Sequence, residues 1–136
     1  MTNVILSGIG SYIPTQVVKN EDFLRTSFYE VNGEKIQLDN ETIIQKFHAI
    51  TGIEERRYAE ADQLSSNLAL IAAERAIADA GCDKESIDII IYAHNFGDVA
   101  IDKVQSDVLP SLASRVKHAL GIQNINCNAF DLLAGC

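Results

Sequence analysis

The stretch SSNLALIAAERAIADAGCDKESIDIIIY, residues 65–92, decides the fold class of this chain. Its first part places apolar residues at helical spacing, which predicts a helix from Ser65 or Ser66 to Ala80 that ends at Gly81. Its second part, Ile87–Tyr92, is rich in β-branched residues and is predicted to be a strand. A strand this apolar, following a helix, is typical of a parallel sheet covered on both faces. The stretch therefore predicts an α/β fold.

The flanking sequence extends this alternation toward the N-terminus. Val4–Ser7 predicts a strand, and the glycines and proline of Gly8–Pro14 predict a tight turn after it. Asn20 and Asn40 are suitable N-caps for two helices. Between them, the Asn-Gly pair of Val31–Glu34 predicts a small β-excursion.

Toward the C-terminus, Pro110 is predicted to be the first residue of a helix that ends before Gly121. Asn126–Leu132 then predicts a final strand. The order strand, helix, strand, helix, strand indicates one layered α/β domain, in keeping with the length of 136 residues.

Composition narrows the function classes. The chain has 19 acidic and 11 basic side chains and a formal net charge of -8. This balance argues against non-specific nucleic-acid binding and against adhesion to anionic membranes. The sequence has no apolar run near the roughly 20 residues of a membrane span, and its start lacks the features of a signal peptide. We therefore expect a cytoplasmic protein that binds neither membrane nor nucleic acid.

The three cysteines are not arranged as a metal or dithiol motif, so no metal site is predicted. Cys82 and Cys127 are assigned to packing. Cys136 follows Gly135 at the point where a further helix is expected to begin. A helix N-terminus lowers the pKa of a thiol and favours the nucleophilic thiolate. On spacing alone, a core cysteine is still the preferred interpretation of Cys136.

The histidines and the paired glycines carry weaker signals. The segment Gly8-x-Gly10 lacks the third glycine and the helix of a dinucleotide-binding loop, so a structural turn is preferred. His94 follows the predicted strand Ile87–Tyr92, and a loop histidine bonded to the backbone is preferred over a catalytic one. His118 lies in the last turn of a predicted helix, where a cation suits the dipole, and is given no function.

Three segments in order carry a family resemblance. Gly8–Pro14, Thr51–Arg56 and Ala129–Cys136 together resemble the 3-oxoacyl-[acyl-carrier-protein] synthase III family of the thiolase superfamily. The resemblance implies that residues 1–136 are the N-terminal half of a thiolase-like fold with α-β-α-β-α layers, usually dimeric. The family's catalytic His and Asn belong to a C-terminal half that is not in this chain, so we expect residues 1–136 alone to be inactive.

The resemblance also implies a reaction. An acyl group moves from a thioester of coenzyme A or of acyl carrier protein onto a cysteine, and the acyl-enzyme then condenses with a malonyl thioester in fatty acid biosynthesis. The family's nucleophile lies five residues after the aspartate of a Phe-Asp pair, and here Cys136 lies five residues after Asp131. The thioesters are substrates, and no permanently bound cofactor is implied.

Two departures from the family pattern concern the substrate. Where members that use short acyl-CoA primers carry a tryptophan and an arginine around the adenine of coenzyme A, this chain has Lys46 and Ile50. Extra residues also occur around Glu30–Asn40 and His94–Asp107. Both departures put the identity of the primer in question.

Three functions fit these residues: a condensing enzyme, a related acyltransferase or hydroxymethylglutaryl-CoA synthase, and a non-catalytic thiolase-fold subunit. A carrier protein is acidic and needs a basic docking patch. Solvated surface charge is nevertheless the preferred role for most of the basic side chains available, which are Arg56, Arg57, Lys103, Arg115 and Lys117.

Overall fold

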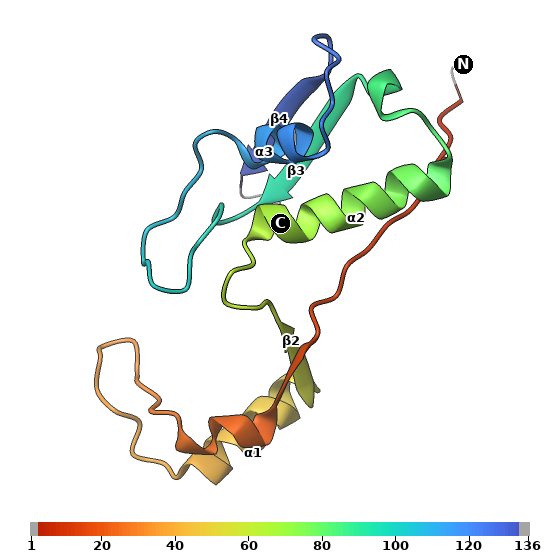
Figure 1. The fold of residues 1–136 in the computed structure, drawn as a ribbon. Coiled ribbons are helices and arrows are strands. Elements are labelled where there is room, and N and C mark those ends of the chain that lie inside the picture. The colour runs from red at the N-terminus through yellow and green to blue at the C-terminus, as the bar shows by residue number, and fades with distance from the viewer. Residues whose placement is uncertain (1–2, 134–136) are drawn as a thin grey trace. The chain divides into compact units, whose positions relative to one another are not determined.

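The computed structural model describes residues 3–133, which form two compact units. One unit contains residues 3–13 and 59–133, and the other is Pro14–Tyr58. No helix of residues 3–133 is long and apolar enough to cross a membrane. The elements, in chain order, are β1 (Gln16–Lys19), η1 (Asn20–Arg25), α1 (Asn40–Thr51), β2 (Glu55–Tyr58), α2 (Ser65–Ala80), η2 (Lys84–Ser86), β3 (Ile89–His94), α3 (Leu112–Ala119) and β4 (Asn128–Leu133) (Figure 1).

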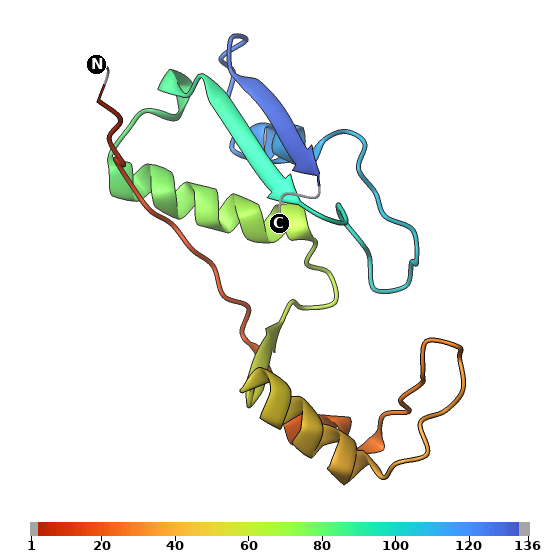
Figure 2. The ribbon, with the colours of Figure 1, turned by 180° about the vertical axis from the view of Figure 1, so that it is seen from behind.

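The larger unit is a parallel strand pair with two helices. β3 and β4 pair in register from Ile89 opposite Asn128 to His94 opposite Leu133. The connection between them contains α3, which packs against both strands and against α2 (Figures 1 and 2). A parallel pair requires such a crossover, so the α/β fold predicted from residues 65–92 is confirmed.

α2 has the bounds that its sequence predicts, and Gly81 ends it with φ of +61°. β3 begins two residues later than predicted and extends to His94. Within residues 3–133 this strand is covered on one face only. Ile89 and Ile91 are 56% and 61% exposed, because no helix in this part of the chain packs on their side of the sheet.

The neighbouring strand repeats this one-sided burial. Phe130 and Leu132 of β4 are each 53% exposed on the same open face. The buried apolar side chains of this unit lie instead on and after α3, at Leu112, Ala113, Val116, Ile122 and Cys127. The core of the larger unit therefore lies on one side of the sheet, and the other side is a row of exposed apolar side chains.

Residues 3–14 form neither the strand predicted at Val4–Ser7 nor the turn predicted at Gly8–Pro14. The segment runs extended along α2 (Figures 1 and 2). Its backbone bonds to α2 side chains instead of to a neighbouring strand: the Ile9 N–H donates to Asp79 Oδ2 at 2.9 Å, and Arg75 Nη1 donates to the Ser11 carbonyl at 2.6 Å. These two bonds attach the part of the segment after Val4–Ser7 to α2.

The smaller unit is built from an antiparallel pair and two helices. β1 pairs with β2 from Gln16 opposite Tyr58 to Lys19 opposite Glu55. η1 packs on α1, and residues 26–39 connect the two. The predicted β-excursion is confirmed as a single bridge between Tyr29 and Lys35.

The predicted helix starts are shifted by one or two residues. Asp39, not Asn40, caps α1, because its carboxylate accepts from the Thr42 N–H, while the Asn40 side chain donates to two carbonyls of the preceding loop. α3 begins at Leu112, not at the predicted Pro110, and Ser111 caps it through its hydroxyl. In both cases the residue whose side chain reaches the first turn sets the boundary.

Gly8 and Gly10 let the N-terminal segment approach the α2 backbone. A Cβ at Gly8 would lie 2.6 Å from the Ala76 carbonyl oxygen, and a Cβ at Gly10 would overlap the Ala72 carbonyl oxygen and the Ala76 nitrogen. We expect Gly10→Ala to lower the free energy of unfolding by about 1–3 kcal/mol, because helix backbone cannot move aside for a methyl group. Urea denaturation measures the change. Ser7→Ala, at an exposed position of the same segment, is the matched control, and equal stability of the two variants would contradict the packing argument.

Candidate functional site

The predicted nucleophile Cys136 lies outside the described residues. The chain reaches it from the carboxyl end of β4, whose last residue is Leu133. Ligands of open α/β sheets bind at the carboxyl ends of the strands. The described part of the candidate site is therefore the shared carboxyl end of β3 and β4, where His94 and Asp131 face the N-terminus of α3.

Asp131 joins both strands to α3. Its side chain is 11% exposed. Oδ1 accepts the Ala113 N–H at 2.8 Å, and Oδ2 accepts the Leu112 N–H at 2.7 Å and lies 3.1 Å from His94 Nε2. A helix N-terminus presents unpaired N–H groups and a positive dipole end, so a carboxylate suits this position.

The environment of Asp131 has two opposing effects on its pKa. Burial raises the pKa of the carboxyl, whereas hydrogen bonds from the Ala113 N–H, from His94 and from the Leu112 N–H lower it. The hydrogen bonds prevail, and the pKa of Asp131 lies below its ordinary value. Asp131 is therefore an anion at neutral pH, with its oxygens committed to α3 and His94.

His94 has both ring nitrogens engaged. Its ring is 5% exposed, and Nδ1 accepts the Gly97 N–H at 2.9 Å. A ring that accepts at Nδ1 carries its proton on Nε2, which donates to Asp131. The predicted bond to the backbone is confirmed. The predicted loop location is wrong, since His94 is the last residue of β3.

A second carboxylate, Asp98, anchors the start of α2 and was not identified from the sequence. It is 2% exposed and accepts from the Ser66 N–H at 2.8 Å, from Ser66 Oγ at 2.6 Å and from Arg115 Nη1 at 2.9 Å. Arg115 Nη2 also lies 2.8 Å from Asp107 Oδ1. The segment after His94 is thereby bonded to α2 and α3 at Asp98, and to α3 again at Asp107. Asp98 and Arg115 are 17 positions apart in the sequence, and this spacing does not predict that they are in contact.

Two of the cations considered for a docking patch have internal partners instead. Arg115 pairs with Asp98 and Asp107, and Lys117 Nζ donates to the carbonyls of Asn124 and Cys127 at 3.0 and 2.6 Å. The preferred interpretation as solvated charge is wrong for these two side chains. The cysteines also differ from one another: Cys127 is buried as expected, but Cys82 is exposed.

The two positions assigned to coenzyme A lie on α1 of the smaller unit. Lys46 and Ile50 are one helical turn apart, and both are exposed, Ile50 by 81%. No aromatic side chain stands at either position. Their role in binding coenzyme A stays a prediction.

Comparison with known proteins extends these observations. No family model matches the chain. It is 36% identical over 132 residues to beta-ketoacyl-[acyl-carrier-protein] synthase III of Bradyrhizobium diazoefficiens, with 97% of this chain and 33% of that relative covered. It is 38% identical over 129 residues to beta-ketoacyl-[acyl-carrier-protein] synthase III 1 of Vibrio parahaemolyticus, with 95% and 34% covered. The chain thus spans about a third of the length of these relatives.

Solved structures give the same result. The beta-ketoacyl-[acyl carrier protein] synthase III from Thermus thermophilus matches with a TM-score of 0.65 and 29% identity, covering 95% of this chain and 33% of that one. The chain is similar to part of beta-ketoacyl-[acyl-carrier-protein] synthase III. A 3-oxoacyl-(acyl-carrier protein) synthase from Burkholderia xenovorans LB400, with a TM-score of 0.70 and 22% identity over 95% of this chain and 31% of that one, shares the fold. The described residues therefore form part of a thiolase-like fold, as the sequence motifs predict.

The synthase-like chain should depend on Asp131 for stability in a pH-dependent way. We expect Asp131→Asn to lower the free energy of unfolding by about 2 kcal/mol at pH 7, since charge-assisted hydrogen bonds are lost. A folded-state pKa below the unfolded value of about 3.9 gives stability that is present above that pH and is lost as the pH falls through the folded pKa. The difference between variant and parent should therefore shrink in acid.

Denaturant titrations at pH 7 and at about pH 3 measure this difference. Asp88→Asn removes an exposed carboxylate that makes no side-chain hydrogen bond within residues 3–133, and it serves as the control. A loss of stability for Asp131→Asn that is the same at both pH values would mean that packing, not charge, is responsible.

Proposed function

We propose that this chain is the part of a beta-ketoacyl-[acyl-carrier-protein] synthase III-type condensing enzyme that carries the acylated nucleophile, Cys136. The observation that carries the proposal is the similarity to relatives of that name over 97% and 95% of the chain. Because the chain spans about a third of their length, turnover is proposed for a protein that also contains the residues activating the malonyl group.

The first half-reaction is acyl transfer. The Cys136 thiolate attacks the carbonyl carbon of an acyl thioester, and the negative charge that develops on the oxygen is held by backbone N–H groups, including that of Cys136. A new C–S bond forms, the bond to the carrier sulfur breaks, and the carrier thiolate leaves and takes up a proton. Covalent capture divides a difficult condensation into two easier steps.

The second half-reaction is decarboxylative condensation. Loss of carbon dioxide leaves an electron pair on the α-carbon of the malonyl thioester. This carbon attacks the acyl carbon on Cys136, so a C–C bond forms, the C–S bond breaks, and the thiolate is returned. The product is a 3-oxoacyl thioester.

The contacts of Asp131 support the assignment of Cys136. A nucleophile reacts efficiently only when it is held in a fixed geometry. Asp131 precedes Cys136 by five residues and is itself bonded to α3 and His94. The segment that leads to the nucleophile therefore starts from a fixed point on the sheet.

The nucleophile assignment is tested by mapping the acyl group. We expect a protein incubated with an acyl thioester to carry the acyl adduct on Cys136, and Cys136→Ser to abolish its rapid transfer. Mass spectrometry of the digested protein locates the adduct. Cys82→Ser is the matched control, because Cys82 is the exposed thiol of the described residues and is not proposed to react. An adduct on Cys82 or Cys127 with Cys136 unmodified would contradict the proposal.

Because Lys46 and Ile50 stand where a tryptophan and an arginine would hold the adenine, we expect acetyl-CoA to be a poor primer. Longer acyl chains or carrier-bound acyl groups should acylate the enzyme faster. An aromatic surface under a base contributes about 1–3 kcal/mol, so its absence corresponds to about tenfold or more in coenzyme A affinity. The rate of acyl-enzyme formation against a primer series measures the preference. A clear preference for acetyl-CoA would refute it.

The exposed positions on α1 allow the same prediction to be tested by introducing an aromatic side chain. Lys46→Trp should accelerate acylation by acetyl-CoA, because an aromatic ring is restored without disturbing a buried side chain. Gln45→Trp, one position away and also exposed, is the control and should have no effect.

A further inference from the structure

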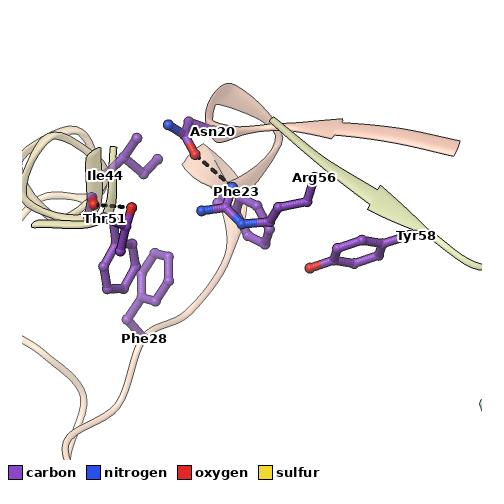
Figure 3. Close-up of a pocket in the computed structure, with 8 residues that line it drawn as sticks. Asn20, Phe23, Phe28, Ile44, Thr51, Arg56 and Tyr58 are labelled. Atoms are coloured by element: carbon purple, nitrogen blue, oxygen red, sulfur yellow. Dashed lines mark hydrogen bonds between the residues drawn. The ribbon is translucent and has the colours of Figure 1, made fainter. Parts of the chain in front are cut away.

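A pocket in the smaller unit has no role in the proposed reaction. It has a volume of about 270 Å³ and is lined by Asn20, Phe23, Phe28, Ile44, Phe47, Thr51, Arg56 and Tyr58 (Figure 3). All eight residues belong to Pro14–Tyr58, and neither Lys46 nor Ile50 is among them. Its volume is just below the usual range of about 300–1,000 Å³ for ligand pockets, which favours a small ligand.

The walls of this pocket are mainly aromatic and come from all parts of the unit. Phe28, from the segment that connects η1 to α1, packs edge to face on Phe47 of α1, with ring centroids 5.7 Å apart. Ile44 and Thr51 lie on the same face of α1 as Phe47, at helical spacing. The Thr51 hydroxyl donates to the Phe47 carbonyl at 2.6 Å, so this polar group is already satisfied by its own helix.

Two of the polar side chains of the pocket, Arg56 and Tyr58, come from β2. Arg56 and Tyr58 are two residues apart on one strand and therefore project to the same side (Figure 3). The Tyr58 hydroxyl has no hydrogen-bond partner within residues 3–133. The pocket thus offers one cation and one hydroxyl against walls of aromatic rings.

The guanidinium of Arg56 is held in place without a counter-charge. Nη1 donates to Asn20 Oδ1 at 2.7 Å, and Cζ lies 5.2 Å from the centroid of the Phe23 ring. Asn20 is itself fixed, because its Nδ2 donates to the Ile53 carbonyl at 2.8 Å. Arg56 is half-buried, yet none of the carboxylates in residues 3–133 forms an ion pair with it, in a chain whose net charge is -8.

The neighbouring arginine shows the contrast. Arg57 points to the other side of β2, is exposed, and pairs with Glu55 at 3.0 Å. Half-buried cations are ordinarily paired or strongly hydrogen-bonded, because desolvation disfavours their charge. An oriented guanidinium without a carboxylate, beside aromatic walls, is complementary to an anion with an apolar body.

We propose that this pocket binds a small carboxylate with a flat apolar body, whose carboxylate pairs with Arg56 and whose body packs on Phe23, Phe28 and Phe47. The site is independent of Cys136 and of the condensation reaction. The carboxylate replaces the missing counter-charge, and the Tyr58 hydroxyl can donate to its second oxygen. The aromatic walls determine the shape of the body that fits.

Isothermal titration calorimetry of the full-length protein tests the proposal with phenylacetate as the probe. Phenylacetamide, which keeps the ring and loses the charge, and acetate, which keeps the charge and loses the ring, should each bind about tenfold more weakly or not at all. This comparison needs no variant. Failure of phenylacetate to bind, or equal binding of phenylacetamide, would overturn the proposal.

Variants then locate the site. Arg56→Gln should weaken phenylacetate binding by about tenfold or more, and the control Arg57→Gln should leave it unchanged. Cys136→Ala should also bind phenylacetate as the parent does, so that this result does not depend on the acylation chemistry. Equal loss with Arg56→Gln and Arg57→Gln, or no loss with Arg56→Gln, would place binding elsewhere and overturn the assignment.

Discussion

The larger unit depends on one carboxylate, that of Asp131, at the point where two strands and a helix meet. Its oxygens accept hydrogen bonds from two N–H groups that the first turn of α3 leaves unpaired, and from the Nε2–H of His94. A negative charge is favourable there because the helix dipole and the N–H groups point toward it. Since β3 and β4 pair in parallel through the α3 crossover, this contact fixes the helix to the end of the sheet from which the chain continues to Cys136.

Asp98 repeats this arrangement for α2. The residue before α2 is Leu64, which has no side chain able to cap a helix, and Asp98 supplies the missing acceptor to Ser66. Both helices of the unit therefore begin at carboxylates from distant parts of the chain. Arg115 connects Asp98 to Asp107, so the extra residues after His94 are part of this network. The insertion is anchored to the scaffold at its base.

The polar group that joins several elements of the smaller unit is a cation, Arg56, whereas in the larger unit such groups are carboxylates. Arg56 is oriented by Asn20 and Phe23 and faces a pocket instead of an acidic partner. The open face of the sheet, with Ile89, Ile91, Phe130 and Leu132, is a second apolar surface left uncovered in residues 3–133. The two surfaces differ in chemistry: the pocket combines apolar walls with a charge, and the sheet face is apolar throughout. A pocket that combines a charge with apolar walls favours a specific ligand, because the charge fixes the orientation of the ligand and the walls bury its apolar surface.

Local sequence determined the elements that depend on local physics. The period of residues 65–80 and the glycine after them specify α2, because a helix closes its hydrogen bonds within a few residues. The order of elements and the motifs at Thr51–Arg56 and Ala129–Cys136 also sufficed for the family resemblance. Tertiary structure alone decided that Val4–Ser7 is not a strand, because an extended apolar segment becomes a strand only if another strand offers its backbone. In the described residues the same N-terminal segment is held further along, where α2 side chains bond to the backbone of Ile9 and Ser11. Tertiary structure also decided the contacts of Asp131, Asp98 and Arg56, since each joins residues 17 to 37 positions apart, a separation at which spacing carries no information about distance.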